Sequence, residues 1–459
     1  MQKKGTFHFE LSERKLLLRF LDVILSLLGL HLIGSVFEFD YFTLQEGKWI
    51  WSILLVSYLL FFGTVFELYD LTKSSDFFKS FKAIVLAVSV TVLCYILTPF
   101  LTPELPESRV QIIYFFISIV ISICLGRLAY INLINAPIFR KNVILIADGN
   151  RLKEIEKEIK EADTNYNIQY VINSDESNTK FHSKAISSDK LLTVLDKGIH
   201  EIIVTRSSKF SSKKLYNDLL QAFNNGYLVK EYAEVYEDLT NRVQVSFKDN
   251  EFYKQFPFSK YNNKPLYIWV HRFFDIVFGL IGGLFLVLTI IPLVFLGNLF
   301  ANKGPMFYTQ ERVGKNGKTF NIYKLRSMVV NAEREGAVWA QKNDSRVTRF
   351  GKFLRKTRLD EFPQFINIIK GEMSVIGPRP ERPVFVGELA KEIPFYSTRH
   401  IIKPGLTGWA QVNTSYGATV EDSLLKLQYD LFYIKHRNIF LDFKIVLKTL
   451  STVIFFRGQ

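Results

Sequence analysis

Two adjacent carboxylates, Asp360 and Glu361, follow directly on a run of cations in the segment FGKFLRKTRLDEFPQ. The cations just before them are Arg355, Lys356 and Arg358. In a phosphate-handling site one carboxylate can hold a divalent cation while the other acts on phosphorus. Arginine binds phosphate oxygens in a planar, bidentate manner. An adjacent Asp–Glu pair on a surface helix is more often a solvated salt-bridge partner, so the pair alone supports only a hypothesis.

Further charged residues surround this pair along the chain. They are Arg312, Lys324, Arg326, Arg379 and Glu381. Turns at Gly371 and in the segment GPRP can bring the downstream residues back toward the carboxylates. Residues 310–358 hold thirteen Lys and Arg against four Asp and Glu. The pattern predicts a site for an anionic, phosphorylated substrate.

The composition narrows the class of protein. The chain has 459 residues, 48 % of them hydrophobic, and a formal net charge of +14. These values exclude an intrinsically disordered chain, a collagen-like chain and a disulfide scaffold. Both cysteines, Cys94 and Cys124, lie in apolar segments without disulfide or metal spacing, which indicates a reducing compartment for the polar parts. Nucleic acid would explain the charge but not the apolar segments, so we expect no nucleic-acid partner.

The elements that must position the charged residues begin with apolar segments near the N-terminus. Each approaches or exceeds the roughly 20 residues that cross a bilayer. The first contains Asp22 and lacks a cleavage site, which argues against a signal peptide. Lys and Arg flank the segments so that the N-terminus and the chain beyond residue 140 are predicted to be cytoplasmic. We therefore expect a four-helix transmembrane domain over residues 1–139, with spans at about 16–36, 49–66, 83–101 and 110–134.

Residues 140–250 alternate short apolar runs with helical patterns, which predicts a small Rossmann-like α/β module. The turn after the first strand carries only Gly149 instead of the glycine-rich dinucleotide fingerprint. A structural or regulatory role is favoured over nucleotide binding for this module.

A second apolar block covers residues 273–300 and contains Pro292. Proline removes a backbone donor and clashes one turn back, so the helix is expected to kink or break there. Basic residues flank both ends, which favours a re-entrant membrane helix over residues 265–300 rather than a kinked span.

Three segments appear in order after this block: QERVGKNGKTFNIYKLRSM, RKTRLDEFPQFINIIKGEMSVIGPRPERP and KPGLTGWAQVN. Together they resemble the bacterial sugar transferase family, the monotopic phosphoglycosyl transferases. The resemblance covers about residues 265–459, and the spans and α/β module are similar to those of the large members that initiate exopolysaccharide, capsule or O-antigen synthesis. It implies transfer of a sugar 1-phosphate from a UDP-sugar to undecaprenyl phosphate with release of UMP.

The resemblance also implies roles for individual residues. Asp360 would be the nucleophile that forms a covalent aspartyl-phosphosugar, and Glu361 would be the ligand of Mg²⁺. Pro292 matches the family's helix-breaking proline, although Ile291 stands where many relatives have serine. The chain also departs from the Gly-Arg that often follows AQVN, and Arg399 could supply the missing basic contact. The predicted phosphate-binding residues are Arg312, Lys324, Arg326, Arg355, Arg358, Arg379, Glu381 and Arg399.

The expected molecule is thus a multi-pass protein of the bacterial inner membrane with a mostly helical cytoplasmic catalytic domain over residues 301–459. Its C-terminal segment is expected to form one or two helices lying in the membrane interface. The sequence leaves open the sugar, the polysaccharide and assembly into a homo-oligomer. Two other functions stay open: a glycosyl or phosphoglycosyl transferase without a covalent intermediate, and a non-catalytic assembly or regulatory protein of the polysaccharide machinery.

Overall fold

The computed structural model describes most of the chain. The described residues are 11–37, 39, 41–42, 47–70, 74, 76–134, 140–148, 151–163, 166–173, 184–205, 213–245, 264–301, 304–330, 332, 344–414, 417 and 419–454. Gly149 and most of the segment after AQVN lie outside these residues. The chain divides into two compact units, Met1–Tyr232 and Ala233–Gln459.

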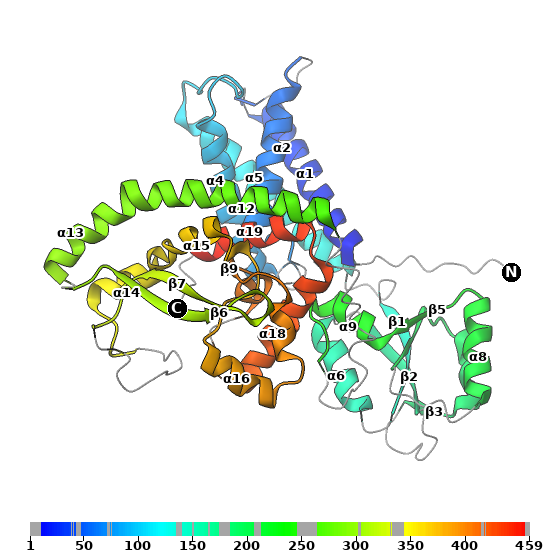
Figure 1. Cartoon of the computed structure of the whole chain (residues 1–459). Coiled ribbons are helices and arrows are strands. Elements are labelled where there is room, and N and C mark those ends of the chain that lie inside the picture. Colours follow the sequence, from blue (N-terminus) through cyan, green and yellow to red (C-terminus); the bar gives the residue numbers. More distant parts are fainter. Residues whose placement is uncertain are drawn as a thin grey trace. The chain divides into compact units, whose positions relative to one another are not determined.

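The first unit opens with four apolar helices (Figure 1). They are α1 (Leu11–Val36), α2 (Trp49–Val65), α4 (Phe77–Ile96) and α5 (Arg109–Ile134). Three of them, α1, α4 and α5, are long and apolar enough to cross a membrane, and α2 is a shorter apolar helix. Helices α1 and α5 approach closely at Gly126, where a Cβ atom would lie 2.8 Å from Leu25. The four predicted apolar segments are therefore confirmed as helices.

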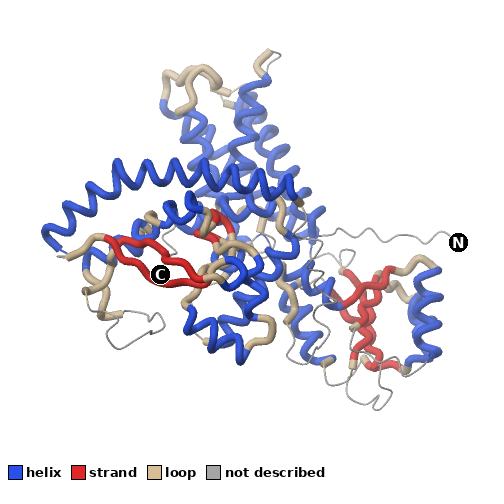
Figure 2. The backbone as a smooth tube through the Cα atoms, in the orientation of Figure 1, coloured by secondary structure: helices blue, strands red, loops and turns tan. Residues whose placement is uncertain are grey.

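The same unit contains the α/β module, whose five strands form one parallel sheet in the order β3-β2-β1-β4-β5 (Figure 2). The predicted α/β class of this module is confirmed. The chain moves from β1 to β2 in one direction across the sheet and from β4 to β5 in the opposite direction. Right-handed crossovers therefore put α6 and α8 on opposite faces of the sheet. The elements are β1 (Lys141–Ala147), α6 (Leu152–Ala162), β2 (Tyr166–Asn173), β3 (Ala185–Ile186), η2 (Ser188–Lys190), α7 (Leu191–Leu195), β4 (Glu201–Val204), α8 (Lys213–Asn224) and β5 (Leu228–Glu231).

The second unit combines helices with two small pairs of strands. Strands β6 (Phe307–Val313) and β7 (Thr319–Leu325) form an antiparallel hairpin, and β8 (Ser374–Ile376) pairs in parallel with β9 (Gly405–Thr407). The helical elements are α9 (Tyr232–Thr240), α12 (Pro265–Phe285), η3 (Leu286–Ile290), α13 (Ile291–Ala301), η4 (Lys315–Gly317), α14 (Arg349–Lys356), η5 (Leu359–Glu361), α15 (Gln364–Lys370), α16 (Pro383–Glu392), η6 (Tyr396–Ile401), α17 (Trp409–Asn413), α18 (Val420–His436) and α19 (Ile439–Ile454).

Two valines just before residue 246 pack with the second unit, Ala233–Gln459. Val243 and Val245 belong to the same buried cluster as Leu427 of α18. The Trp409 indole N–H donates to the carbonyl of Asn241 at 3.1 Å. Residues 241–245 therefore belong to the core of the second unit, because their apolar side chains are buried there.

The segment around Pro292 stays helical. A π-helical turn, η3, lies directly before α13, so the chain from Pro265 to Ala301 is one continuous helical segment. Figure 1 shows that α13 curves away from the line of α12 without reversing direction. A widened turn accommodates the proline that cannot donate to the turn before it. The interruption expected at Pro292 is thus a bend and not a break in the helix.

The two C-terminal helices differ in their surroundings. Helix α18 buries Leu427, Leu431 and Ile434 in the core of the second unit. Helix α19 exposes Phe440 and Phe443, as a helix at a membrane interface would. Helix α18 is thus a core element, and the expected position at the membrane interface stays a prediction for α19.

Candidate active site

The two carboxylates Asp360 and Glu361 lie on η5, the short turn that joins α14 to α15. The residue before this turn, Arg358, has a φ of 60°, in the left-handed region that costs a non-glycine residue about 1–3 kcal/mol. Such strain is typical of functional sites where the surrounding structure over-determines the backbone.

Helices α14 and α15, on the two sides of η5, pack against the long apolar helical segment formed by α12 and α13. A Cβ atom at Gly282 of α12 would lie 2.5 Å from the ring of Phe365 in α15. A Cβ atom at Gly297 of α13 would clash with the ring of Phe350 in α14. Arg272 of α12 donates to the carbonyls of the last turn of α15, at 2.7 and 2.8 Å. These contacts hold the carboxylates against the helix that we expect in the membrane.

Asp360 is largely buried, with 8 % of its surface exposed. Its Oδ1 atom has no hydrogen-bond partner among the described residues. Burial, and next the neighbouring Glu361 carboxylate, raise the pKa of Asp360 to about 6, against the opposing effect of Lys324 and Arg355. At neutral pH the group is therefore an ionised, poorly solvated carboxylate, which is the state that a nucleophile needs.

Glu361 has the opposite electrostatic behaviour. Burial alone would raise the pKa of its carboxyl, but Arg379, Lys324 and Arg358 outweigh burial and lower the pKa of Glu361 to about 2. Its Oε1 atom accepts from Arg379 Nη2 at 2.8 Å and lies 3.6 Å from Arg358 Nη1. Glu361 thus stays charged at every physiological pH.

Lys324 of β7 faces both carboxylates. Burial lowers the pKa of Lys324 to about 8, although Glu361 favours the charged form. Arg355 is held in place by its Nε atom, which donates to Ser327 Oγ at 2.9 Å. Four cations, Lys324, Arg355, Arg358 and Arg379, therefore act on the two carboxylates. This surplus of positive charge is suited to an anionic ligand.

Arg379 is positioned by a residue that sequence reasoning missed. Its Nη1 atom donates to Gln411 Oε1 at 3.2 Å, and its carbonyl accepts from Arg399 Nη2 at 3.3 Å. Gln411 lies in the segment WAQVN, so the sequence indicated the motif but not the role of the Gln411 amide. A glutamine carries no charge and has no characteristic spacing, so the sequence does not mark it as a site residue.

Four other predicted phosphate ligands have protein partners. Arg399 forms a buried pair with Asp430 at 2.7 Å and donates to the Tyr396 hydroxyl at 2.7 Å. Arg326 donates to the carbonyls of Pro305 and Met328, at 2.6 and 3.2 Å. Arg312 and Glu381 approach each other to 3.5 Å, next to Arg379 in the electrostatic field of the site. Direct phosphate contact by these residues stays a prediction.

The carboxylate pair is compatible with Mg²⁺. Among the described residues there is no group of three or more His, Cys, Asp or Glu side chains that could hold a metal ion. Mg²⁺ usually takes only one or two protein carboxylates and completes its shell with water and substrate phosphates. Glu361 with the unpartnered Oδ1 of Asp360 fits such a site.

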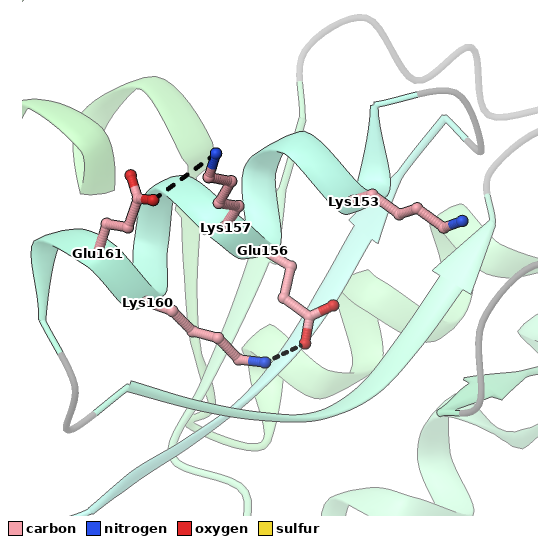
Figure 3. Close-up of a pocket in the computed structure, with 5 residues that line it drawn as sticks. All are labelled: Lys153, Glu156, Lys157, Lys160 and Glu161. Atoms are coloured by element: carbon pink, nitrogen blue, oxygen red, sulfur yellow. Dashed lines mark hydrogen bonds and ion pairs between the residues drawn. The ribbon is translucent and has the colours of Figure 1, made fainter.

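A surface hollow on α6 lies in the α/β module, apart from these residues in the chain (Figure 3). Its lining consists of Lys153, Glu156, Lys157, Lys160 and Glu161. Ion pairs join Glu156 to Lys160 at 2.7 Å and Lys157 to Glu161 at 3.8 Å. These are neighbours one helical turn apart on a solvated face, so the hollow adds nothing to the active site.

Residues 266–456 match the family model described as bacterial sugar transferase. The UDP-N-acetylgalactosamine-undecaprenyl-phosphate N-acetylgalactosaminephosphotransferase of Aeromonas hydrophila is 43 % identical over 223 residues, 48 % of this chain and 51 % of that protein. The putative undecaprenyl-phosphate N-acetylgalactosaminyl 1-phosphate transferase of Bacillus subtilis (strain 168) is 54 % identical over 133 residues, 29 % of this chain and 74 % of the relative.

The UDP-glucose:undecaprenyl-phosphate glucose-1-phosphate transferase of Xanthomonas campestris pv. campestris is 43 % identical over 161 residues, 34 % of this chain and 33 % of that protein. The chain thus spans about half the length of the Aeromonas hydrophila relative and a third of the Xanthomonas one. The chain belongs to the bacterial sugar transferase family.

Proposed function

We propose that this protein transfers a sugar 1-phosphate from a UDP-sugar to undecaprenyl phosphate, with Asp360 as the nucleophile, at the start of a polysaccharide pathway. One observation supports this more than any other. Asp360 is a buried carboxylate with an unpartnered oxygen, and it lies within a surplus of cations beside a long apolar helix. A nucleophile that must approach an anionic diphosphate needs this surplus, because otherwise the two negative charges repel each other.

In the first step a carboxylate oxygen of Asp360 attacks the phosphorus that carries the sugar. A new O–P bond forms, the bond from that phosphorus to the oxygen of UMP breaks, and UMP leaves with the electron pair. Lys324, Arg355 and Arg379 compensate the negative charge that moves onto the departing phosphate. Asp360 needs no general base, because it is already ionised at neutral pH.

In the second step a phosphate oxygen of undecaprenyl phosphate attacks the same phosphorus. The aspartyl O–P bond breaks, Asp360 regains its carboxylate, and the product is a lipid-linked diphosphosugar. Glu361 would hold Mg²⁺, which supplies charge neutralisation to the donor diphosphate when bound.

The acceptor's lipid tail stays in the bilayer, so the site must lie at its surface. We propose that α12 and α13 enter the membrane without crossing it, with the catalytic unit on the cytoplasmic side of the bacterial inner membrane. The glycine contacts of both helices with the elements around η5 support this arrangement.

The test is nucleotide release by the purified full chain. It is given undecaprenyl phosphate, Mg²⁺ and a panel of UDP-sugars that begins with UDP-N-acetylgalactosamine and UDP-glucose, the donors in the relatives' names. We expect UMP from at least one donor, and no UMP from Asp360→Asn. With that donor alone, the protein should gain the mass of one phosphosugar.

Three results would contradict the proposal. Release of UDP instead of UMP would indicate a glycosyl transfer. Full turnover in Asp360→Asn would remove the nucleophile. Absence of both turnover and adduct with all donors would favour a non-catalytic role.

A further inference from the structure

One carboxylate on the apolar helix α12 has no part in the proposed reaction. Asp275 is only 3 % exposed, whereas Phe273, Phe274 and Ile276 beside it on the helix are exposed. An ionisable side chain in an apolar helix is costly, and such residues are rare unless they have polar partners and a function. The partners of Asp275 therefore indicate its role.

Asp275 binds strand β8. Its Oδ1 atom accepts from Ser374 Oγ at 2.8 Å and from the backbone N–H of Val375 at 2.8 Å. Its Oδ2 atom lies 3.7 Å from Nδ1 of His271, one turn earlier on α12. Ser374 Oγ in turn accepts from the N–H of Ile376 at 3.2 Å. A single carboxylate on the helix thus holds all three residues of the strand, directly or through Ser374.

The other edge of β8 is held by β9 and the residues before it. The Ser374 N–H donates to the Pro404 carbonyl at 2.9 Å, and the Gly377 N–H donates to the Thr407 carbonyl at 2.9 Å. A Cβ atom at Gly377 would clash with the carbonyl of Lys403. The position of β8 therefore depends on two contacts, one with β9 and one with Asp275 of α12.

Strand β8 leads directly to a cation of the active site. Arg379 is the third residue after β8, and its Nη2 atom donates to Glu361 Oε1 at 2.8 Å. Pro378 and Pro380 stand on both sides of Arg379, and proline has a fixed φ. Little backbone freedom separates the end of β8 from Arg379, so a shift of the strand is transmitted to this residue.

The same turn of α12 also holds the carboxylate side of the site. Arg272, three residues before Asp275, donates to two carbonyls in the last turn of α15 at 2.7 and 2.8 Å. Helix α15 follows η5, which carries Glu361. One turn of α12 thus fixes the carboxylate segment through Arg272 and the Arg379 segment through Asp275.

We propose that Asp275 is a positioning residue, which keeps Arg379 at hydrogen-bond distance from Glu361 by holding β8 against α12. The proposal rests on the proposed function, in which Arg379 is one of the cations that compensate the charge on the departing phosphate. Without the Asp275 carboxylate, α15 keeps its own contacts with α12, whereas β8 loses the contact on one edge. Arg379 is then displaced from a site that otherwise stays assembled.

Hydrogen exchange of the detergent-solubilised full chain, measured by mass spectrometry, tests the contact without any substrate. In Asp275→Ala we expect the amides of residues 374–379 to exchange at least about tenfold faster, with no change in α15. Asp275→Asn keeps an acceptor oxygen and should retain most of the protection. If Asp275→Ala does not fold, Ser374→Ala, which removes one of the two donors, takes its place. Unchanged exchange of residues 374–379, or equal acceleration throughout the second unit, would overturn the proposal.

Turnover tests the consequence for the reaction. Asp275→Ala should reduce UMP release about thirtyfold, the effect of losing hydrogen bonds to a charged group. In an Arg379→Ala background the same change should cost less than about threefold, because no guanidinium is left to position. Asp275→Asn should stay within about fivefold of the unaltered chain, since it keeps the acceptor. The control is Glu237→Ala, which removes another buried and paired carboxylate of the second unit and should leave turnover within about twofold.

Two outcomes separate this proposal from the proposed function. Equal losses from Asp275→Ala with and without Arg379 would overturn the positioning role, because Asp275 would then act through general stability. An unaltered chain that releases no UMP with any donor would contradict the proposed function instead. The exchange experiment would still decide whether Asp275 holds β8.

Discussion

The chain contains two buried constellations of acidic and basic side chains, one in the apolar helices and one in the catalytic unit. They differ in the balance between their negative and positive charges. In the apolar helices, Asp22 and Arg127 are fully buried and form a pair at 2.9 Å, and Arg127 also donates to the carbonyl of Leu68 at 3.1 Å. In the catalytic unit, two carboxylates face four cations. The first constellation pairs one carboxylate with one cation, whereas in the second the cations that act on the two carboxylates outnumber them.

An unpartnered oxygen does not by itself distinguish the two constellations. Both Asp22 Oδ1 and Asp360 Oδ1 lack a hydrogen-bond partner among the described residues. The charge balance does distinguish them, and so does the strained backbone at Arg358, next to the carboxylates. We propose that the closed pair, Asp22 with Arg127, is a structural element and that the open cluster around Asp360 is a binding site. The predictions below test this contrast.

The largest expected effect is on catalysis at Asp360. Asp360→Asn should reduce UMP release by about 10⁴-fold or more, because it removes the nucleophile. The same variant should unfold at an equal or higher temperature at pH 7, since a buried carboxylate next to Glu361 is replaced by a neutral group. Parallel measurements of turnover and thermal unfolding check both statements. A large loss of stability would place Asp360 among the structural residues.

The next effect is on stability at the closed pair. Asp22→Asn should lower the free energy of unfolding by about 3 kcal/mol, because it leaves the Arg127 charge buried without a counter-charge. Unfolding of the detergent-solubilised chain measures this. The double variant Asp22→Leu with Arg127→Leu should recover most of the loss. If Asp22→Asn abolished turnover without loss of stability, the pair would belong to the function.

A smaller effect on turnover is expected at Gln411, which positions Arg379 in the open site. Gln411→Ala removes one acceptor from Arg379 and should reduce turnover about tenfold, the value of one hydrogen bond to a charged group. Gln411→Glu keeps the acceptor oxygen and should restore most of the activity. Asn413→Ala in the same short helix is the control, since Asn413 contacts Trp409 and Lys448 instead. Equal losses of turnover in Gln411→Ala and Asn413→Ala would indicate that Gln411 acts only through the stability of the helix.

The smallest effect is the pH dependence. kcat/KM should fall below an apparent pKa of about 6, where Asp360 is protonated, and above about 8, where Lys324 loses its charge. The raised pKa of Asp360 also implies that its contribution to stability decreases as pH rises from about 4 to about 6, because the folded state holds the proton more tightly than the unfolded state does. Lys324→Arg should remove the alkaline limb. A profile without an acid limb would contradict the ionised nucleophile.

Much of the architecture could be predicted because it depends on local patterns. The four apolar helices were predicted from length and hydropathy, and the α/β module from alternating short apolar runs and helical patterns. The π-helical turn before Pro292 was not predicted, since a proline shows that a helix is disturbed but not how its neighbours absorb the disturbance. The packing of Val243 and Val245 against α18 was not predicted either, because in the sequence these two residues look like the end of the preceding module.

By itself the sequence determined the family, through motifs whose order and residue types are specific, and it named Asp360 and Glu361 as the central pair. Only the tertiary structure decided how the charges are divided among the residues around that pair. It assigns Arg399 to Asp430, Arg326 to backbone carbonyls and Gln411 to Arg379. The physical reason is that a charged or polar side chain shows its type in the sequence, whereas its partner depends on which distant segments burial brings within hydrogen-bond distance.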